Sequence, residues 1–184
     1  MKIIETPIPD LLIIEPRVFA DERGYFFESY NASNFEKYGL QNNFVQDNES
    51  KSQRGVIRGL HYQLEPYSQT KLIRVIHGTV YDVAVDLRKG SPTFGQWYGL
   101  EVSAANKKQF YIPKGFAHGF SVLSEYAIFS YKCDNFYNPA SERGIRYDDS
   151  ALGIDWKLSE AEALVSEKDR ILPFLAGAEI NFSY

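Results

Sequence analysis

The stretch of sequence that decides the fold class is TVYDVAVDL, residues 79–87. In a strand its even-numbered side chains share one face and its odd-numbered side chains share the other, the alternation typical of β-structure. Gly78 precedes this stretch and follows a second β-like run, Lys71–Ile76. We therefore expect the two runs to form a β-hairpin that turns near His77 and Gly78.

Further short β-like runs lie on both sides of this stretch, separated by Gly, Pro and Asn. They are Leu11–Glu15, Gly24–Tyr30, Phe44–Asn48, Tyr98–Val102, Gln109–Ile112, Gly119–Leu123 and Tyr126–Lys132. Many short strands divided by turn residues are typical of a β-sandwich, barrel or jelly roll. Helix signals are few. Capping-box patterns at Ser33 with Glu36, ending near Gly39, and at Ser159 with Glu162 predict two short helices. We expect one mostly β domain over residues 1–184 with a few short peripheral helices.

Composition excludes several broad classes of protein. The net charge of −4 argues against nucleic-acid binding, which usually requires a basic excess. Cys133 is the only cysteine, so no internal disulfide can form and a reducing compartment is the simpler expectation. The apolar run Leu11–Ile14 is too short for a signal peptide, and no stretch is long enough to cross a bilayer. We expect a cytoplasmic protein without a membrane partner.

The densest group of polar side chains lies between residues 46 and 63. It includes Arg58 and His61, and Lys71 follows soon after. Regular alternation would put Arg58 and His61 on opposite faces of a strand. A single histidine is more often structural than catalytic. Arg58 and Lys71, however, fit the interior of a β-sandwich only if they are paired with anions, and an anionic substrate would supply that pairing.

Two further segments bear on chemistry. Pro113, Gly115 and His118 match the second half of the pattern of cupins, jelly rolls that often hold a metal through three histidines and a glutamate. The first half of that pattern is missing, and one of the three histidines, His77, falls at the expected turn, so we expect no metal. Tyr131 shares a strand face with apolar neighbours. It is either a core tyrosine or a proton donor, and spacing alone does not decide.

Taken together and in order, the segments resemble the dTDP-4-dehydrorhamnose 3,5-epimerase family of rhamnose biosynthesis. The similarity covers nearly the whole chain without a large gap. It is carried by Val18–Glu28, Phe44–Asn48, Arg58–Gln63, Lys71–Val75, Asp82–Arg88, Ser91–Gly95, the His118 segment, Tyr131–Cys133, Tyr137–Pro139, Glu142–Ile145 and Ser166–Asp169. A departure is the run Pro66–Thr70, where many relatives carry smaller residues, so Tyr67 is expected to reshape the pocket edge.

The resemblance implies a cupin-type jelly roll and an epimerase that inverts C3 and C5 of dTDP-4-keto-6-deoxy-D-glucose. His61 matches the family's general base, Asp169 the carboxylate that orients it, and Tyr131 the proton donor on the other face of the sugar. Lys71 matches a cation near the 4-keto oxygen, and Tyr137 matches an aromatic that stacks on thymine. Further matches to substrate contacts are Arg23, Glu28, Gln46, Asp47, Asn48, Arg58, His118, Glu142 and Lys168. The resemblance also implies a homodimer with exchanged N-terminal strands.

The expected chemistry is proton exchange beside a ketone, which is redox-neutral and needs no nicotinamide or other cofactor. The sequence also lacks a Gly-rich dinucleotide fingerprint after a strand. Three alternatives remain open at this point. They are a mono-epimerase or ketoisomerase acting on a related nucleotide sugar, a nucleotide-sugar-binding protein without turnover, and a metal-dependent cupin oxygenase.

Overall fold

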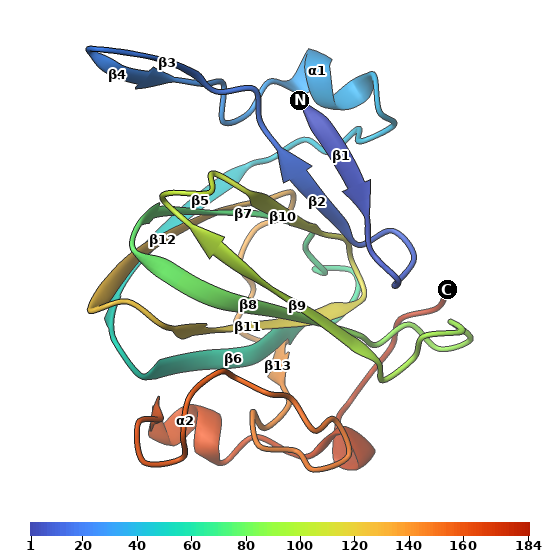
Figure 1. The fold of residues 1–184 in the computed structure, drawn as a ribbon. Helices are drawn as coiled ribbons and strands as arrows, with labels where there is room; N and C mark the ends of the chain where they lie inside the picture. Colours follow the sequence, from blue (N-terminus) through green and yellow to red (C-terminus); the bar gives the residue numbers. More distant parts are fainter.

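Two β-sheets face each other in a jelly roll, in a computed structural model that describes all residues from Met1 to Tyr184 (Figure 1). The first sheet has the strand order β1 (Lys2–Glu5), β2 (Leu12–Glu15), β10 (Gln109–Ile112), β7 (Lys71–His77), β12 (Tyr126–Cys133) and β5 (Gln46–Gln53). The second sheet has the order β13 (Glu142–Gly144), β6 (Val56–Gln63), β11 (Phe116–Val122), β8 (Thr79–Asp86) and β9 (Trp97–Ser103). The short strand β14 (Leu164–Val165) pairs with β6 in parallel. This architecture confirms the predicted fold class.

The ends of the predicted strands are mostly correct. The runs predicted as β2, β7, β8, β9, β10 and β12 end within one residue of the observed strands. Larger shifts occur at β5, which begins at Gln46 instead of Phe44, and at β11, which begins at Phe116 instead of Gly119. The short edge strands β1 and β13 were not predicted, because three or four residues carry too little alternation to stand out.

Strand β8 shows why the molecule has two apolar cores. Its inward side chains, among them Val80 and Ala84, pack in the cluster between the sheets. Its outward side chains, among them Val83 and Val85, pack in a second cluster with Trp156 from the C-terminal part of the chain. The predicted alternation of this strand is thus confirmed, with both faces buried. Burying one valine side chain contributes about 1.5–3 kcal/mol.

The predicted hairpin at His77 and Gly78 is wrong, because β7 and β8 belong to different sheets. Gly78 has a φ of 79°, and a Cβ there would lie 2.2 Å from the carbonyl oxygen of Tyr126. Only glycine fits this tight corner, where the chain leaves the first sheet and enters the second. A local turn signal marks where the chain changes direction but does not specify which strand it pairs with next.

The first predicted helix is present as α1 (Ala32–Glu36), but its N-cap is Asn31 instead of Ser33. The Asn31 side chain accepts a hydrogen bond from the backbone N–H of Asn34 at 3.3 Å. Gly39 has a φ of 79° just beyond the helix, as expected for the residue that ends it.

The second helix lies elsewhere than predicted. The Glu162 carboxylate accepts the backbone N–H of Ser159 at 3.0 Å, as in a capping box, and also accepts the Ser159 hydroxyl at 2.8 Å, but the segment forms only a turn. The helix α2 (Glu167–Arg170) follows, capped by Ser166, and a 3₁₀ helix spans Leu175–Gly177. No helix has the length and apolar character needed to span a membrane.

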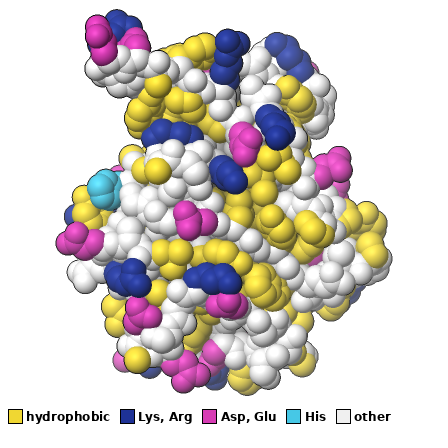
Figure 2. Space-filling model, viewed as in Figure 1, with side chains coloured by type: hydrophobic (Ala, Val, Ile, Leu, Met, Phe, Trp, Pro, Cys, Tyr) yellow, Lys and Arg dark blue, Asp and Glu magenta, His cyan; other side chains and the backbone are white.

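A hairpin of β3 (Phe19–Asp21) and β4 (Gly24–Phe26) extends away from the two sheets (Figure 1). Every residue of both strands is exposed, and the side chains include Phe19, Tyr25 and Phe26, which is 67% exposed. Figure 2 shows charged side chains at the tip of this projection. We call this hairpin the arm; its second strand ends at Phe26, four residues before the predicted end at Tyr30.

Candidate active site

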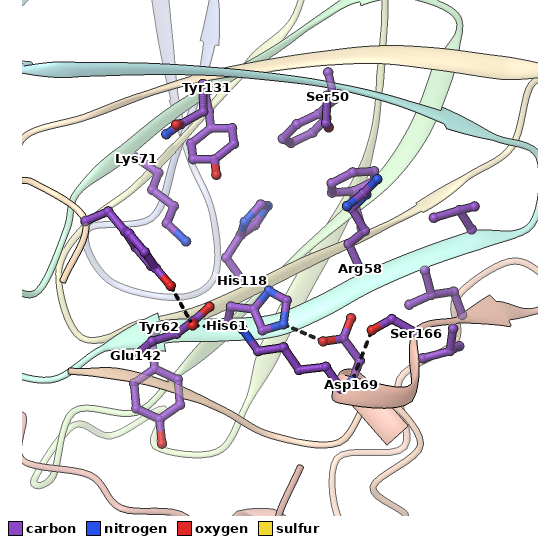
Figure 3. A pocket seen from close by; sticks show the side chains of 18 of the residues that line it. Ser50, Arg58, His61, Tyr62, Lys71, His118, Tyr131, Glu142, Ser166 and Asp169 are labelled. Atoms are coloured by element: carbon purple, nitrogen blue, oxygen red, sulfur yellow. Dashed lines mark hydrogen bonds and ion pairs between the residues drawn. The ribbon is translucent and has the colours of Figure 1, made fainter. Parts of the chain in front are cut away.

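A cavity of about 770 Å³ opens between the two sheets. Figure 3 shows Tyr131 and Lys71 on one side of it, and His61, Arg58 and Asp169 on the other. Ten of the predicted site residues line the cavity: Asn48, Arg58, His61, Lys71, His118, Tyr131, Tyr137, Glu142, Lys168 and Asp169. The fold therefore brings together residues that are more than a hundred positions apart in the sequence.

His61 on β6 forms a hydrogen-bonded pair with Asp169 on α2, with 2.7 Å between Nε2 and Oδ1 (Figure 3). The other carboxylate oxygen of Asp169 accepts the backbone N–H of Gly59 at 3.3 Å. Burial alone would raise the pKa of Asp169, but the hydrogen bond and charge of His61 lower it below its usual value. An ionised Asp169 favours the tautomer in which Nε2 donates to it. That leaves Nδ1 of His61 as the nitrogen that can accept a proton.

Arg58 and His61 both line the cavity, contrary to the expected alternation. In the pairing of β11 with β6, His118 lies opposite His61 while Phe120 lies opposite Arg58, so β6 holds one extra residue. Gly59, within this bulge, has a φ of 124°, and a Cβ there would lie 2.6 Å from the Cα of Gly119. The bulge changes the phase of the strand, and both polar side chains face the cavity as a result.

Tyr131 on β12 and Lys71 on β7 form the opposite wall, with the Lys71 ammonium 5.9 Å from the centre of the Tyr131 ring. Burial raises the pKa of Tyr131 to about 12. Burial also lowers the pKa of Lys71, and nearby Cys133, Asp82 and Glu142 act in the opposite direction. The Tyr131 hydroxyl points into the cavity (Figure 3). It remains protonated at neutral pH and can donate a proton to a ligand.

A buried carboxylate that sequence patterns did not identify lies on the inner face of the second sheet. Asp82 on β8 has no exposed surface, and it bonds Nε2 of His118 at 2.9 Å. Burial raises the pKa of Asp82, while His118 and Lys71 lower it; burial lowers the pKa of His118. The available signal was that Asp82 shares the inward face of residues 79–87 with Val80 and Ala84, which pack in the core. Asp82 supplies a negative charge that favours the ammonium form of Lys71.

Two phenylalanines span the gap between the sheets beside the cavity. Phe120 on β11 and Phe129 on β12 stack with 4.1 Å between ring centres and 14° between ring planes. Both rings line the cavity. Because one ring comes from each sheet, their contact sets how far apart the two walls lie.

A charged and aromatic cluster lies at the rim of the cavity. Glu142 on β13 accepts hydrogen bonds from Lys168 at 2.8 Å and from the Tyr137 hydroxyl at 2.9 Å. Burial would raise the pKa of Glu142, but these two bonds lower it. Tyr137 itself is 52% exposed, so part of its ring is accessible to a ligand. The side chain of Tyr67 does not line the cavity, in contrast to the expectation that it shapes the pocket edge.

Arg23 and Glu28 do not line the cavity of their own chain. Arg23 lies at the tip of the arm and pairs with Asp21 at 2.6 Å. Glu28 follows the arm and accepts hydrogen bonds from Asn31 at 2.6 Å and Asn34 at 3.3 Å, beside α1. Both residues belong to the segment that extends away from the sheets.

Gln46 and Asp47, at the start of β5, also lie outside the lining of the cavity. Asp47 points away from it and pairs with Lys132 at 2.9 Å. Gln46 accepts a hydrogen bond from the backbone N–H of Tyr137 at 2.9 Å. In this structure Gln46 therefore supports the rim and does not line the cavity.

No three or more His, Cys, Asp or Glu side chains are grouped so that they could hold a metal ion. His77 stacks on Tyr126 with 4.3 Å between ring centres, at the corner between the sheets. His61 and His118 each bond a separate carboxylate. The cavity therefore places a proton-accepting pair, His61 with Asp169, opposite a proton donor, Tyr131, and a cation, Lys71.

Comparison with known proteins identifies a consistent set of relatives. The profile of the family described as dTDP-4-dehydrorhamnose 3,5-epimerase matches residues 5–177. A protein of that name from Pseudomonas aeruginosa is 58% identical over 92% of this chain and 93% of its own length. A dTDP-6-deoxy-D-glucose-3,5-epimerase from Legionella pneumophila, solved with dTDP-4-keto-L-rhamnose, is 52% identical with a TM-score of 0.95, covering 100% of this chain and 98% of its own. A 3'-monoepimerase from Streptomyces bikiniensis, solved with dTDP-quinovose, is 33% identical with a TM-score of 0.86, covering 93% of this chain and 86% of its own.

Proposed function

The chain belongs to the dTDP-4-dehydrorhamnose 3,5-epimerase family, and on that basis we propose that it inverts C3 and C5 of dTDP-4-keto-6-deoxy-D-glucose to give dTDP-4-keto-L-rhamnose. The observation that carries the proposal is the placement of His61 and Tyr131 on opposite walls of one cavity. Inverting a carbon requires removal of a proton from one face and delivery of a proton to the other. We propose that residues 1–184 form one catalytic domain.

Proton removal is the role proposed for His61. The 4-keto group acidifies the hydrogens on both neighbouring carbons, and Nδ1 of a neutral His61 accepts one of them. Asp169, bonded to Nε2 at 2.7 Å, holds the ring and stabilises the imidazolium that forms. The negative charge passes to the keto oxygen as an enolate.

Stabilising the enolate is the role proposed for Lys71. A fixed positive charge beside a developing oxyanion is commonly the largest contribution to catalysis in sites of this kind. Lys71 enters from the wall that also carries Tyr131, and the buried charge of Asp82 favours its ammonium form. His118, bonded to Asp82, fixes that carboxylate in place.

Proton return is the role proposed for Tyr131. Its pKa, raised to about 12, keeps the hydroxyl protonated until the enolate presents a carbon that can take the proton. The resulting phenolate and the protonated His61 then exchange with solvent, which restores both groups. The same two groups act at C3 and at C5 in turn.

Nucleotide binding is the role proposed for the rim. The half-exposed ring of Tyr137 offers a face for thymine to stack on. Arg58 and Lys168 bring positive charge to the cavity, which suits the diphosphate, and the guanidinium of Arg58 can bond two oxygens at once. Asn48, Glu142 and His118 line the same cavity and complete the proposed contacts within one chain.

The arm is proposed to complete the site of a second copy of the chain. Arg23 and Glu28 do not line the cavity of their own chain, and the arm presents exposed aromatic side chains. A homodimer that exchanges N-terminal strands would bury these side chains and could place Arg23, Glu28 and Asp47 near a partner's ligand. Size-exclusion chromatography with light scattering tests the dimer. A cytoplasmic location remains a prediction.

The test of the proposed function is NMR of dTDP-4-keto-6-deoxyglucose incubated with the protein in heavy water, without added cofactor. We expect deuterium at both C3 and C5. Exchange at one carbon alone would identify a mono-epimerase. This is the second candidate function, because the 3'-monoepimerase from Streptomyces bikiniensis shares the fold. Absence of exchange at either carbon would contradict an epimerase.

A further inference from the structure

A single buried carboxamide holds the loop that carries Tyr137. Gln63 on β6 is 5% exposed, and its Nε2 donates to the carbonyl oxygens of Tyr67 at 2.6 Å and Phe136 at 3.2 Å. Its Oε1 accepts the backbone N–H of Asn138 at 2.7 Å. The residues before and after Tyr137 are therefore both bonded to one side chain.

The backbone of Tyr137 itself is held from the other sheet. Gln46 on β5 accepts the Tyr137 N–H at 2.9 Å. The two glutamines thus bind three consecutive residues of the loop, Gln63 from the second sheet and Gln46 from the first. A loop that bridges the two sheets in this way loses little further freedom when a ligand binds, because its backbone is already ordered.

We propose that Gln63 is a positioning residue that fixes the ring of Tyr137 for a nucleobase. This inference rests on the proposed function, in which Tyr137 stacks on the base of a nucleoside diphosphate sugar. Gln63 lies two residues after His61 on the same strand. Strand β6 therefore fixes both the proton-accepting group and, through Gln63, the ring that locates the nucleotide.

This arrangement predicts an effect on nucleotide binding that is separate from proton transfer. Without the carboxamide, two carbonyls and one N–H of the rim loops lose their partner, and the loop is free to move. His61 keeps its own partners, Asp169 and β6. We expect replacement of Gln63 to raise KM and to weaken dTDP binding, with a smaller change in kcat.

The test is a double-mutant cycle measured by calorimetric titration with dTDP. The proteins are wild type, Gln63→Met, Tyr137→Ala and the double variant. Gln53→Met, the same chemical change on the exposed end of β5, is the matched control. Stacking on an aromatic side chain contributes about 5- to 150-fold to the binding of a base, so Tyr137→Ala should weaken dTDP binding by a factor in that range. We expect Gln63→Met to weaken it about 3- to 10-fold, a part of the stacking contribution.

The decisive comparison is how much Gln63→Met weakens dTDP binding in wild type and in the Tyr137→Ala variant. If Gln63 acts through Tyr137, the further loss should be within about twofold, the scatter of independent sites. An equal loss in both backgrounds, or unchanged binding by Gln63→Met, would overturn the inference. Should Gln63→Met fail to fold, the same cycle with Gln63→Glu, which keeps the acceptor for Asn138, decides the question. Failure of the wild type to bind dTDP would contradict the proposed function itself.

Discussion

The two walls of the cavity are built on different physical principles. On the second sheet, His61 is held by hydrogen bonds, through Asp169 to the backbone of Gly59. On the first sheet, the hydroxyl of Tyr131 points into the cavity, and its pKa is set chiefly by burial. Lys71, beside it, also has a pKa shifted chiefly by burial.

This difference teaches how each wall is tuned for its role. A base must present one particular nitrogen, so its ring has to be oriented by bonds of defined direction. A phenol that donates a proton needs only to stay protonated and to point inward, and burial achieves the first without any partner. We therefore expect the second-sheet wall to be sensitive to the loss of single bonds. The first-sheet wall should be sensitive to the loss of the reacting groups and to changes in local charge.

His61→Asn should have the largest effect, because it removes the proton-accepting group of the second-sheet wall. Asparagine is close in shape and can still contact Asp169, but it cannot take up a proton. We expect deuterium exchange at both C3 and C5 to fall by ~1,000-fold or more, within the range for a positioned general base. The measurement is NMR in heavy water, with dTDP titration to show that binding persists. Retention of most activity would mean that the base lies elsewhere.

Tyr131→Phe should separate the two walls, because the phenyl ring preserves the packing and only the hydroxyl is lost. The enolate still forms at His61 and is reprotonated from the face it left. We expect inversion to fall about 100-fold, while deuterium incorporation falls much less. The ratio of incorporated deuterium to inverted product, measured by NMR, is the readout. An unchanged ratio with near-normal turnover would make Tyr131 a core residue.

Asp169→Asn should test how much of the base's effect comes from its orientation. The amide keeps the shape, but its neutral carboxamide no longer stabilises the imidazolium. We expect kcat to fall about 10- to 100-fold, less than for His61→Asn, because the imidazole remains. Steady-state kinetics with Asp155→Asn, an exposed carboxylate on another loop, gives the control. Equal losses in the Asp169 and His61 variants would show that orientation accounts for the whole effect of the base.

Asp82→Asn should have the smallest effect of the four variants. It tests how far the first-sheet wall depends on local charge. Burial lowers the pKa of Lys71, and the charge of Asp82 raises it. Without that charge the pKa of Lys71 falls further, so its ammonium loses its proton at lower pH. We expect the alkaline limb of the kcat profile to move down by about one pH unit. An unmoved limb would show that Asp82 does not control the charge of Lys71.

The sequence predicted what depends on local pattern. The alternation of residues 79–87 correctly indicated a strand, and ten of the site residues implied by the family resemblance line the cavity. Prediction from the sequence failed where pairing between distant strands determines the structure. The turn at Gly78 joins two sheets instead of two paired strands, and nothing local distinguishes these outcomes.

The remaining differences have equally specific causes. Arg58 and His61 face the same cavity because of a bulge opposite β11, which depends on a partner strand about sixty residues away in the sequence. Gln63 escaped notice because its importance lies in bonds to two loops and not in any reactive group. Arg23 and Glu28 lie outside the cavity of their own chain, and the roles expected of them depend on the proposed second copy.

The stacked pair of Phe120 and Phe129 makes the width of the cavity independent of its proton chemistry. The rings set the width between the walls by van der Waals contact alone, and neither exchanges a proton with anything. Substitutions at these two positions can therefore change which sugar fits, while His61, Tyr131 and Lys71 stay the same. A directed-evolution library confined to the two positions would show this. Related enzymes acting on bulkier or smaller nucleotide sugars should differ at this pair before they differ in their acid and base.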